Sequence, residues 1–166
     1  MFKIGELVSY SATGVCEVVD IRCEKLTECE MQYYILKPMY QNASTVYVPV
    51  ENQTLVSRIK PVMTKTQAQS LLENVSDLEF EWVEKDSDRV ALFRETLRLC
   101  DRVQAMAIIK CLYNRQQYLL TLNKHLRTAD AQIFRDAQNI VSGEIALALN
   151  MDIKEANSLI MEKIQE

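Results

Sequence analysis

The spacing of apolar residues changes near residue 60, and this change divides the chain into two unlike parts. Before it, β-branched and aromatic residues gather in short runs at 5–10, 15–22, 33–37 and 45–48. Such runs are typical of strands, and all three prolines, Pro38, Pro49 and Pro61, stand where strands should end, because proline cannot donate to a sheet ladder. The polar stretch 24–30 is predicted to be a hairpin loop. Four or five strands in so few residues indicate a strongly bent sheet or small barrel.

After residue 62, apolar residues recur at three- and four-residue spacing, which predicts amphipathic helices. Residues suited to helix N-termini mark five starts: Thr64 with Gln67, the group 86–88, Asp101, Thr128, and Asp152 with Glu155. We therefore expect an α+β chain, in which a small bent β-sheet module at residues 1–57 precedes an all-α bundle of about five helices at residues 62–166.

The residue types that catalysis and metal binding require do not form a recognisable pattern. Three glycines are too few for a phosphate-binding loop, and the single histidine, His125, is not paired with a carboxylate or a nucleophile in a known spacing. The five cysteines are too widely spaced for zinc ligands. We predict no catalytic residue, metal, cofactor or small-molecule substrate. Unreactive thiols in a reducing compartment are favoured over a thiol-based redox sensor.

The distribution of charge says more than its total. No stretch approaches the roughly 18 apolar residues of a membrane span, and residues 1–6 lack the apolar region of a secretory signal, so we expect a cytoplasmic protein with no membrane partner. The net charge of −4 argues against non-specific nucleic-acid binding by the whole chain. Residues 73–84 hold five acids and no base, whereas residues 85–127 hold nine bases and four acids. The basic stretch is the place where a phosphate backbone would be met, although such stretches more often form a solvated helix face.

Several segments, in their order and spacing, resemble the CarD family of bacterial transcription regulators. They are residues 2–10, Gly14-Val15, 33–37 and 45–52 at the front, and Trp82 ahead of a charged helix and residues 143–149 at the back. The front part is also similar to a module of the transcription-repair coupling factor. The resemblance implies that a Tudor-like (SH3-like) module docks on the β subunit of RNA polymerase. It also implies that the helical domain contacts promoter DNA at the upstream edge of the melted region and stabilises the open complex.

The polymerase-binding residues are expected on an unpaired strand edge. A partner strand can add to such an edge through main-chain hydrogen bonds, while side chains supply specificity. We expect this edge at residues 45–48, with the segment 22–25 facing it. The candidate residues are Arg22, Lys25, Thr45 and Tyr47. Family members often carry a basic residue at the position of Tyr47, and an ordinary half-buried strand aromatic is the alternative interpretation of this tyrosine.

The DNA-binding residues are expected around Trp82, the only tryptophan. An indole beside Lys85 and Arg89 is suited to wedge at a distorted minor groove while the cations hold phosphates. The alternative is a junction residue that packs the first helix of the bundle against the second. Arg115 and the helix N-terminus at Thr128 are further candidates for phosphate contact. Arg94, Arg98 and Arg102 follow at four-residue steps and are interpreted as a solvated face.

The acids that precede Trp82 bear on how DNA would be bound. A surface with acids so close to it binds DNA weakly by itself, and tethering through polymerase compensates by raising the effective concentration to roughly millimolar. We therefore expect contact with promoter DNA that is weak alone and conditional on polymerase. The main alternative is a polymerase-bound adaptor whose helical domain recruits another protein and does not touch DNA.

Overall fold

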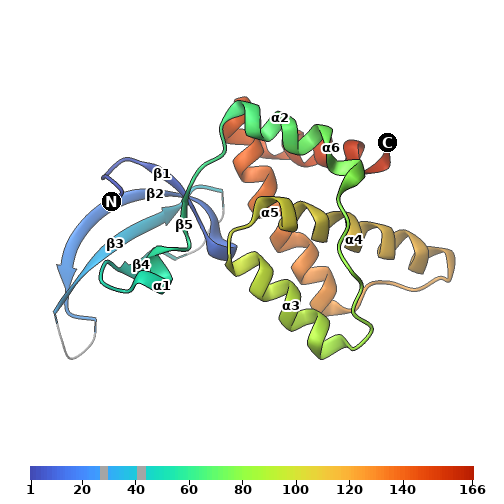
Figure 1. Cartoon of the computed structure of the whole chain (residues 1–166), viewed down its shortest axis with the longest axis horizontal. Coiled ribbons are helices and arrows are strands. Elements are labelled where there is room, and N and C mark those ends of the chain that lie inside the picture. Colours follow the sequence, from blue (N-terminus) through green and yellow to red (C-terminus); the bar gives the residue numbers. More distant parts are fainter. Residues whose placement is uncertain (27–29, 41–43) are drawn as a thin grey trace.

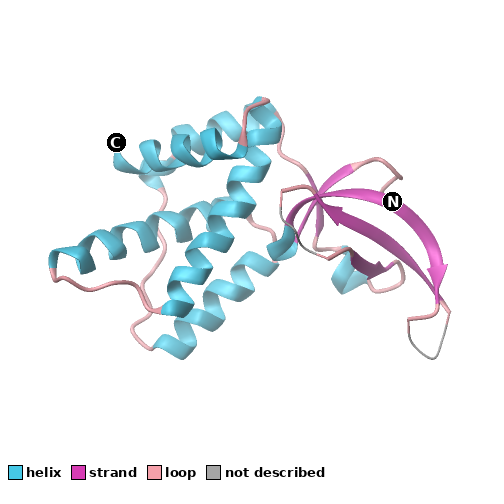
Figure 2. Cartoon of the chain, turned by 180° about the vertical axis from the view of Figure 1, so that it is seen from behind, coloured by secondary structure: helices cyan, strands magenta, loops and turns pink. Residues whose placement is uncertain are grey.

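The chain folds into a β-sheet module followed by a helical domain, as the sequence predicts. The computed structural model describes residues 1–26, 30–40 and 44–166. In Figure 1 the sheet and the helices lie side by side, and Figure 2 shows the same arrangement from behind. The strands are β1 (Leu7–Tyr10), β2 (Gly14–Glu24), β3 (Met31–Pro38), β4 (Val46–Pro49) and β5 (Ile59–Pro61). The helices are α1 (Gln53–Val56), α2 (Lys65–Glu73), α3 (Asp86–Arg98), α4 (Arg102–Thr121), α5 (Thr128–Leu149) and α6 (Ile153–Gln165), with 3-10 turns η1 (Ser11–Thr13) and η2 (Val75–Asp77).

The five strands form one antiparallel sheet in the order β4-β3-β2-β1-β5. Alternate side chains of β1, β2, β3 and β4 point to one face and bury a core that includes Val8, Val18, Leu36 and Val48. The pairing of β2 with β3 shifts register between Val18 and Asp20, and a bulge of this kind bends the strand and increases its twist. The predicted loop 24–30 connects β2 to β3, and its residues 27–29 lie outside the described part of the chain.

The sheet extends past the boundary predicted at residue 57. Strand β5 pairs with β1 and ends at Pro61, so residues 59–61 belong to the sheet. Pro61 was expected to end a strand, but three residues are too few to show an alternating pattern, so the sequence did not delimit this strand. The prediction that each proline ends a strand is confirmed, since β3, β4 and β5 end at Pro38, Pro49 and Pro61.

The helical domain packs around α5, which contacts each of α2, α3, α4 and α6. Thr64 and Gln67 form a capping box at α2, Asp101 accepts hydrogen bonds from the first-turn amides of α4, and Asp152 caps α6, all as predicted. Two predicted caps are wrong by one residue or more. Lys85 is the N-cap of α3, so the acids at 86 and 88 lie within its first turn. Their negative charges still interact favourably with the positive end of the helix dipole. Thr128 is the first residue of α5, and Arg127 is its N-cap.

Candidate nucleic-acid interface

Trp82 lies in the extended segment between η2 and α3, at the end of α3 away from the sheet. Its half-buried ring packs edge-on against the ring of Phe93 of α3, with the two centroids 6.5 Å apart. The ring of Phe80 also packs against the ring of Phe93, with centroids 5.3 Å apart. Lys110 of α4 donates from Nζ to the carbonyls of Ser76 (2.6 Å) and Leu78 (3.0 Å). Aromatic packing and one lysine therefore fix the path of the segment that carries Trp82.

Two guanidinium groups lie over the indole of Trp82. The Cζ of Arg89 is 4.2 Å from the ring centroid and that of Arg115 is 4.7 Å away. Cations within about 6 Å of an indole are attracted by the ring quadrupole. The indole Nε1 is buried and has no hydrogen-bond partner among the described residues, so packing and these cations hold the ring. The structure thus brings Trp82, Arg89 and Arg115 together from two helices and a loop.

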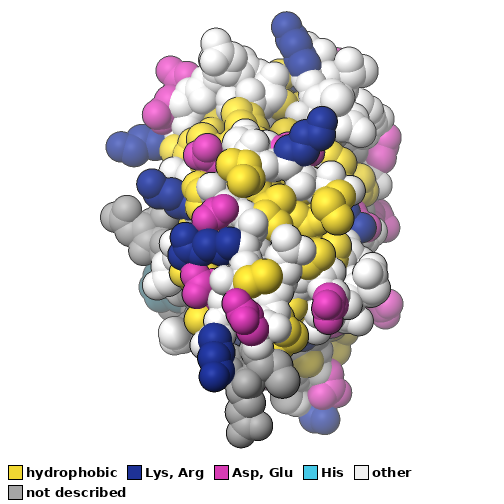
Figure 3. Space-filling view, turned by 90° about the vertical axis from the view of Figure 1, so that its left-hand side faces the viewer, with side chains coloured by type: hydrophobic (Ala, Val, Ile, Leu, Met, Phe, Trp, Pro, Cys, Tyr) yellow, Lys and Arg dark blue, Asp and Glu magenta, His cyan; other side chains and the backbone are white. Residues whose placement is uncertain are grey.

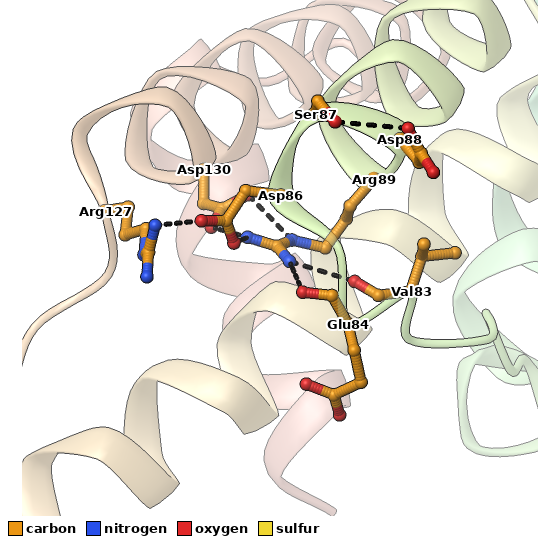
Figure 4. A network of polar contacts seen from close by, with 8 residues as sticks. All are labelled: Val83, Glu84, Asp86, Ser87, Asp88, Arg89, Arg127 and Asp130. Carbon is orange, nitrogen blue, oxygen red and sulfur yellow. Dashed lines mark hydrogen bonds and ion pairs between the residues drawn. The ribbon is translucent and has the colours of Figure 1, made fainter.

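Arg89 is buried and fully engaged within the protein, with 2% of its surface exposed. Figure 4 shows its guanidinium at the centre of a network of polar contacts. It donates to both carboxylate oxygens of Asp130 (3.1 and 2.7 Å), to Asp86 (2.7 Å), and to the carbonyls of Val83 (2.9 Å) and Glu84 (3.3 Å). A guanidinium has five N–H donors, so none is left for a phosphate. The expected phosphate contact of Arg89 therefore needs correction: this arginine ties the Trp82 segment to α3 and α5.

The other basic groups near Trp82 differ in whether an acid already holds them. Arg127 forms an ion pair with Asp86, and Lys85 pairs with Asp88 at 3.2 Å. Arg115 and Lys124 form no ion pair within the described residues. A pocket of about 290 Å³ is lined by Trp82, Arg115, Lys124, Arg127 and their neighbours, and Lys85 does not line it. The buried Arg89 and the acids Glu84, Asp86 and Asp130 line the pocket as well, so it gathers four basic and three acidic residues beside Trp82.

The N-terminus of α5 opens at this pocket, since Arg127 and Asp130 both line it. Arg127 makes no side-chain hydrogen bond to the first amides of the helix. The unpaired amides and the helix dipole give such an end a partial positive charge, which suits a phosphate. The exposed Thr128 lies in this first turn. The sequence therefore placed the helix start one residue late, but at the right end of the domain.

The candidate docking edge lies on the opposite module. Among the strands that the structure describes, β4 lies at an edge of the sheet and pairs with β3 alone. Tyr47 is 39% exposed and packs edge-on against Tyr33 of β3, with centroids 6.3 Å apart, while Thr45 precedes the strand and is exposed. A main-chain edge and an exposed aromatic thus occupy the same strand.

Arg22 and Lys25 do not face this edge, contrary to the prediction. Arg22 lies on β2, and β3 separates β2 from β4 in the sheet. Its guanidinium is paired with Asp20 (3.1 Å) and Glu24 (2.7 Å) of the same strand, because residues two apart point to the same face. Lys25 is exposed just after β2. These two basic residues therefore border the β2–β3 side of the sheet.

The thiols and acids of the described residues form neither a redox pair nor a metal site. Burial raises the pKa of Cys16 to about 12 and also raises the pKa of Cys100 and Cys111. A protonated thiol is a poor nucleophile, so these three cysteines are unlike those of a redox sensor. Cys23 is exposed, and Cys29 lies outside the described residues. Within the described ranges, no three His, Cys, Asp or Glu side chains are grouped to hold a metal, and no helix has the length and apolarity to cross a membrane.

Three charged residues of structural importance were missed from the sequence. Asp130 and Glu144 are buried on α5, with 2% and 0% exposed, and each accepts from an arginine. Arg102, which was assigned to a solvated face with Arg94 and Arg98, instead pairs with Glu144 at 2.8 Å. The available signal was an acid on the apolar face of a helix, as at Glu144 within the run 143–149.

Comparison with known proteins covers both parts of the chain. The family model described as the CarD-like/TRCF RID domain matches residues 2–60. The model described as the CarD C-terminal domain matches residues 70–161, which is more than half of the chain. No curated protein matches the chain significantly. The chain therefore belongs to the CarD family, a family of transcription factors that interact with RNA polymerase.

Proposed function

We propose that this protein docks on the β subunit of RNA polymerase through the edge of β4, and that it stabilises the promoter open complex by placing Trp82 against DNA. The observation that carries the proposal is the pocket around Trp82, which gathers Arg115, Lys124, Arg127 and the N-terminus of α5 beside the only indole of the chain. An apolar wedge flanked by phosphate-binding cations is the arrangement that proteins use at a distorted minor groove.

The two proposed contacts lie at opposite ends of the molecule. The C-terminal end of α3 touches the sheet module, where Cys100 lies 3.3 Å from Ser9. Its N-terminal end leads to Trp82. A helix of 13 residues spans about 20 Å at the usual rise. One face is therefore free for DNA while the other is held by polymerase.

The sheet module presents a surface that suits a protein partner. Figure 3 views the molecule from this end and shows apolar side chains across the middle of the surface, with acidic and basic groups interspersed. Val19, Met39 and Tyr47 are among the exposed apolar residues of the module. A free strand edge beside such a surface supports strand addition by a partner, with the side chains providing specificity.

The test of the function is the lifetime of a promoter open complex formed by polymerase with and without the protein. Trp82→Ala is expected to shorten the lifetime about tenfold, because an aromatic contact with bases is worth roughly 1–3 kcal/mol. Trp82→Phe keeps an aromatic ring against Phe93 and should retain more of the lifetime, and circular dichroism of both variants separates loss of DNA contact from loss of folding. Leu92→Ala, at an exposed position of α3, serves as control.

Docking is measured in parallel by capture of the β subunit with the full chain. Tyr47→Ala is expected to weaken capture, whereas Trp82→Ala leaves it unchanged. Full open-complex lifetime with Trp82→Ala and normal β capture would contradict DNA contact and favour the adaptor that recruits another protein. If Tyr47→Ala changes neither capture of the β subunit nor the open-complex lifetime, the docking surface lies elsewhere.

Asp86 is expected to limit DNA binding by the free protein. Its carboxylate holds both Arg89 and Arg127, so Asp86→Asn should release Arg127 for a phosphate. We expect tighter binding to duplex DNA and a log K against log[salt] slope that is steeper by up to about 0.9, the value for one added phosphate contact. Anisotropy of labelled DNA at several salt concentrations measures both.

The matched control for Asp86→Asn is Glu166→Gln. It makes the same change in net charge but frees Lys163 at the end of α6, far along the chain from the pocket. Equal gains from both variants would show that net charge alone, and not Arg127, sets the affinity.

A further inference from the structure

The two modules meet at a buried carboxylate, and we propose that Glu144, held by Arg102, is a positioning residue that couples docking at β4 to DNA contact at Trp82. Glu144 lies on α5 and is 0% exposed. Its Oε2 accepts from the backbone N–H of Met63 (3.0 Å) and from Nε of Arg102 (2.8 Å). This role rests on the proposed function, because it explains how docking of β4 on polymerase fixes the position of Trp82 on DNA.

The two side chains hold the only chain connection between the modules. Residues 62–64 join the end of β5 to the start of α2. Arg102, the first residue of α4, also donates from Nη2 to the carbonyl of Pro61 at the end of β5. The connection is therefore bonded on both sides, to α4 through Arg102 and to α5 through Glu144.

The surfaces beside this connection approach closely because they carry glycines. A Cβ on Gly143 of α5 would lie 3.0 Å from Cδ2 of Tyr40 and 3.7 Å from Val15, and a Cβ on Gly14 would lie 3.4 Å from the Cα of Ile140. Gly14 has a φ of +76°, a conformation that other residues rarely adopt. Sheet and helix thus meet almost backbone to backbone.

The buried charge selects one arrangement of the modules. Rotation of the sheet against α5 would draw the N–H of Met63 away from the buried carboxylate of Glu144 and the carbonyl of Pro61 away from Arg102. The Arg102–Glu144 pair joins α4 to α5 within the helical domain and fixes the carboxylate in place, and a buried acceptor that loses a donor is unfavourable. The apolar contacts alone are less directional, because hydrophobic burial does not depend on orientation.

The helix α5 carries this orientation to the DNA site. Asp130, which holds Arg89 beneath Trp82, and Glu144 lie on the same helix, about 20 Å apart at the usual rise per residue. A change in the angle between the sheet and α5 at Glu144 therefore displaces the Trp82 pocket relative to β4, because the pocket lies at the other end of this length of helix. Polymerase docking places Trp82 on DNA only if this angle is fixed.

The first test measures the distance between the modules in the free protein. Trp82 is the only tryptophan and serves as energy-transfer donor, and the exposed Cys23 of β2 carries an acceptor dye in a Cys29→Ser, Cys111→Ser background. We expect a narrow distance distribution in this parent. Glu144→Gln, which keeps the side-chain volume, and Arg102→Gln, which keeps a polar side chain, should each broaden or shift the distribution. Glu95→Gln, which breaks the exposed pair with Arg98, should not.

An unchanged narrow distribution in folded Glu144→Gln and Arg102→Gln proteins would overturn the proposal. This measurement uses no polymerase or DNA, so it decides the coupling even if the proposed function fails. Circular dichroism of each variant establishes that it is folded, and two variants are used so that one unfolded protein does not remove the test.

The second test restores the orientation by a different bond. Ser9 Oγ lies 3.3 Å from Cys100 Sγ across the interface, so Ser9→Cys places two thiols within about 1.3 Å of the usual disulfide length of about 2.05 Å. Glutathione disulfide accepts the two electrons and leaves as two thiols when the cross-link forms. Mass spectrometry of peptides identifies the pair.

We expect Glu144→Gln to shorten the open-complex lifetime at least about fivefold, the lower end for coupling between two sites, with unchanged capture of the β subunit. In the Ser9→Cys, Glu144→Gln protein, oxidation should restore the lifetime and reductant should abolish the rescue. A lifetime that stays short after the cross-link forms, with a narrow distance distribution, would show that Glu144 does not act through orientation.

Discussion

Replacing Arg89 by methionine is expected to lower the free energy of unfolding by about 3–5 kcal/mol, the cost of leaving one member of a buried ion pair without its partner. Asp130 is only 2% exposed and receives two hydrogen bonds from Arg89. The carbonyls of Val83 and Glu84 lose their donor in the same variant. Urea unfolding monitored by circular dichroism measures the loss.

The same substitution is expected to release Trp82. The Cζ of Arg89 lies 4.2 Å from the indole centroid of Trp82, and its guanidinium donates to the carbonyls of Val83 and Glu84, which follow Trp82 in the chain. In the folded variant the fluorescence emission of the single tryptophan should shift to longer wavelength, and its indole should be quenched more strongly by acrylamide. Open-complex stabilisation should then fall with it, although Arg89 itself has no donor free for DNA.

Two controls distinguish this explanation from a general effect of losing an arginine. Arg98→Met removes an exposed arginine of the same helix, and surface changes of this kind stay within about 0.5 kcal/mol. The double variant Arg89→Met, Asp130→Leu removes both charges and should recover much of the stability, because apolar replacement of a buried pair is often neutral. A double variant as unstable as the single one would show that packing of Arg89, and not its charge, carries the effect.

The second large effect is expected at Gly143. A side chain there meets Tyr40 at 3.0 Å and the buried Val15 at 3.7 Å. Gly143→Val should therefore lower the free energy of unfolding by about 1–3 kcal/mol, the usual cost of overpacking. Glycine within a helix otherwise costs roughly 0.5–1 kcal/mol relative to alanine, so a helix position without close neighbours would gain stability from the change.

The control is Asn139→Val, an exposed position of the same helix. It is expected to change stability by less than about 0.5 kcal/mol. Limited proteolysis of the connection at residues 62–64 shows whether the modules separate, and Gly143→Val should be cleaved faster. Equal stability of Gly143→Val and the parent protein would mean that Tyr40 swings aside and that the close approach is not required.

Local patterns predicted the elements that are long enough to display them. The runs of β-branched and aromatic residues in β2 and β3 and the helical spacing from residue 65 onward appear in the structure as the sheet and the bundle. Caps at Thr64, Asp101 and Asp152 marked their helices because each is a short-range hydrogen bond between neighbours in sequence. Helix α1 escaped prediction, and only Pro61 at its end marked strand β5, because three or four residues cannot show a period.

The candidate site was predicted only in part. Trp82 and Arg115 were named from residue type and charge, and they are 33 positions apart, yet the guanidinium lies over the indole. Arg89 was named for the same reason and has the opposite fate, since Asp130, 41 residues later, buries and neutralises it. The local sequence offers Asp86, three residues before Arg89, as a partner, but it does not show that the distant Asp130 buries this arginine.

The sequence by itself therefore determined the division into a sheet module and a helical domain, the ends of most elements, and the presence of a lone indole near basic residues. These features depend on side-chain periodicity and on contacts between near neighbours. The tertiary structure decided which charges are available. It paired Arg89 with Asp130 and Arg102 with Glu144 and left Arg115 lining the pocket beside Trp82. The physical reason is that burial and ion pairing depend on which distant segments pack together, and only the folded chain fixes that.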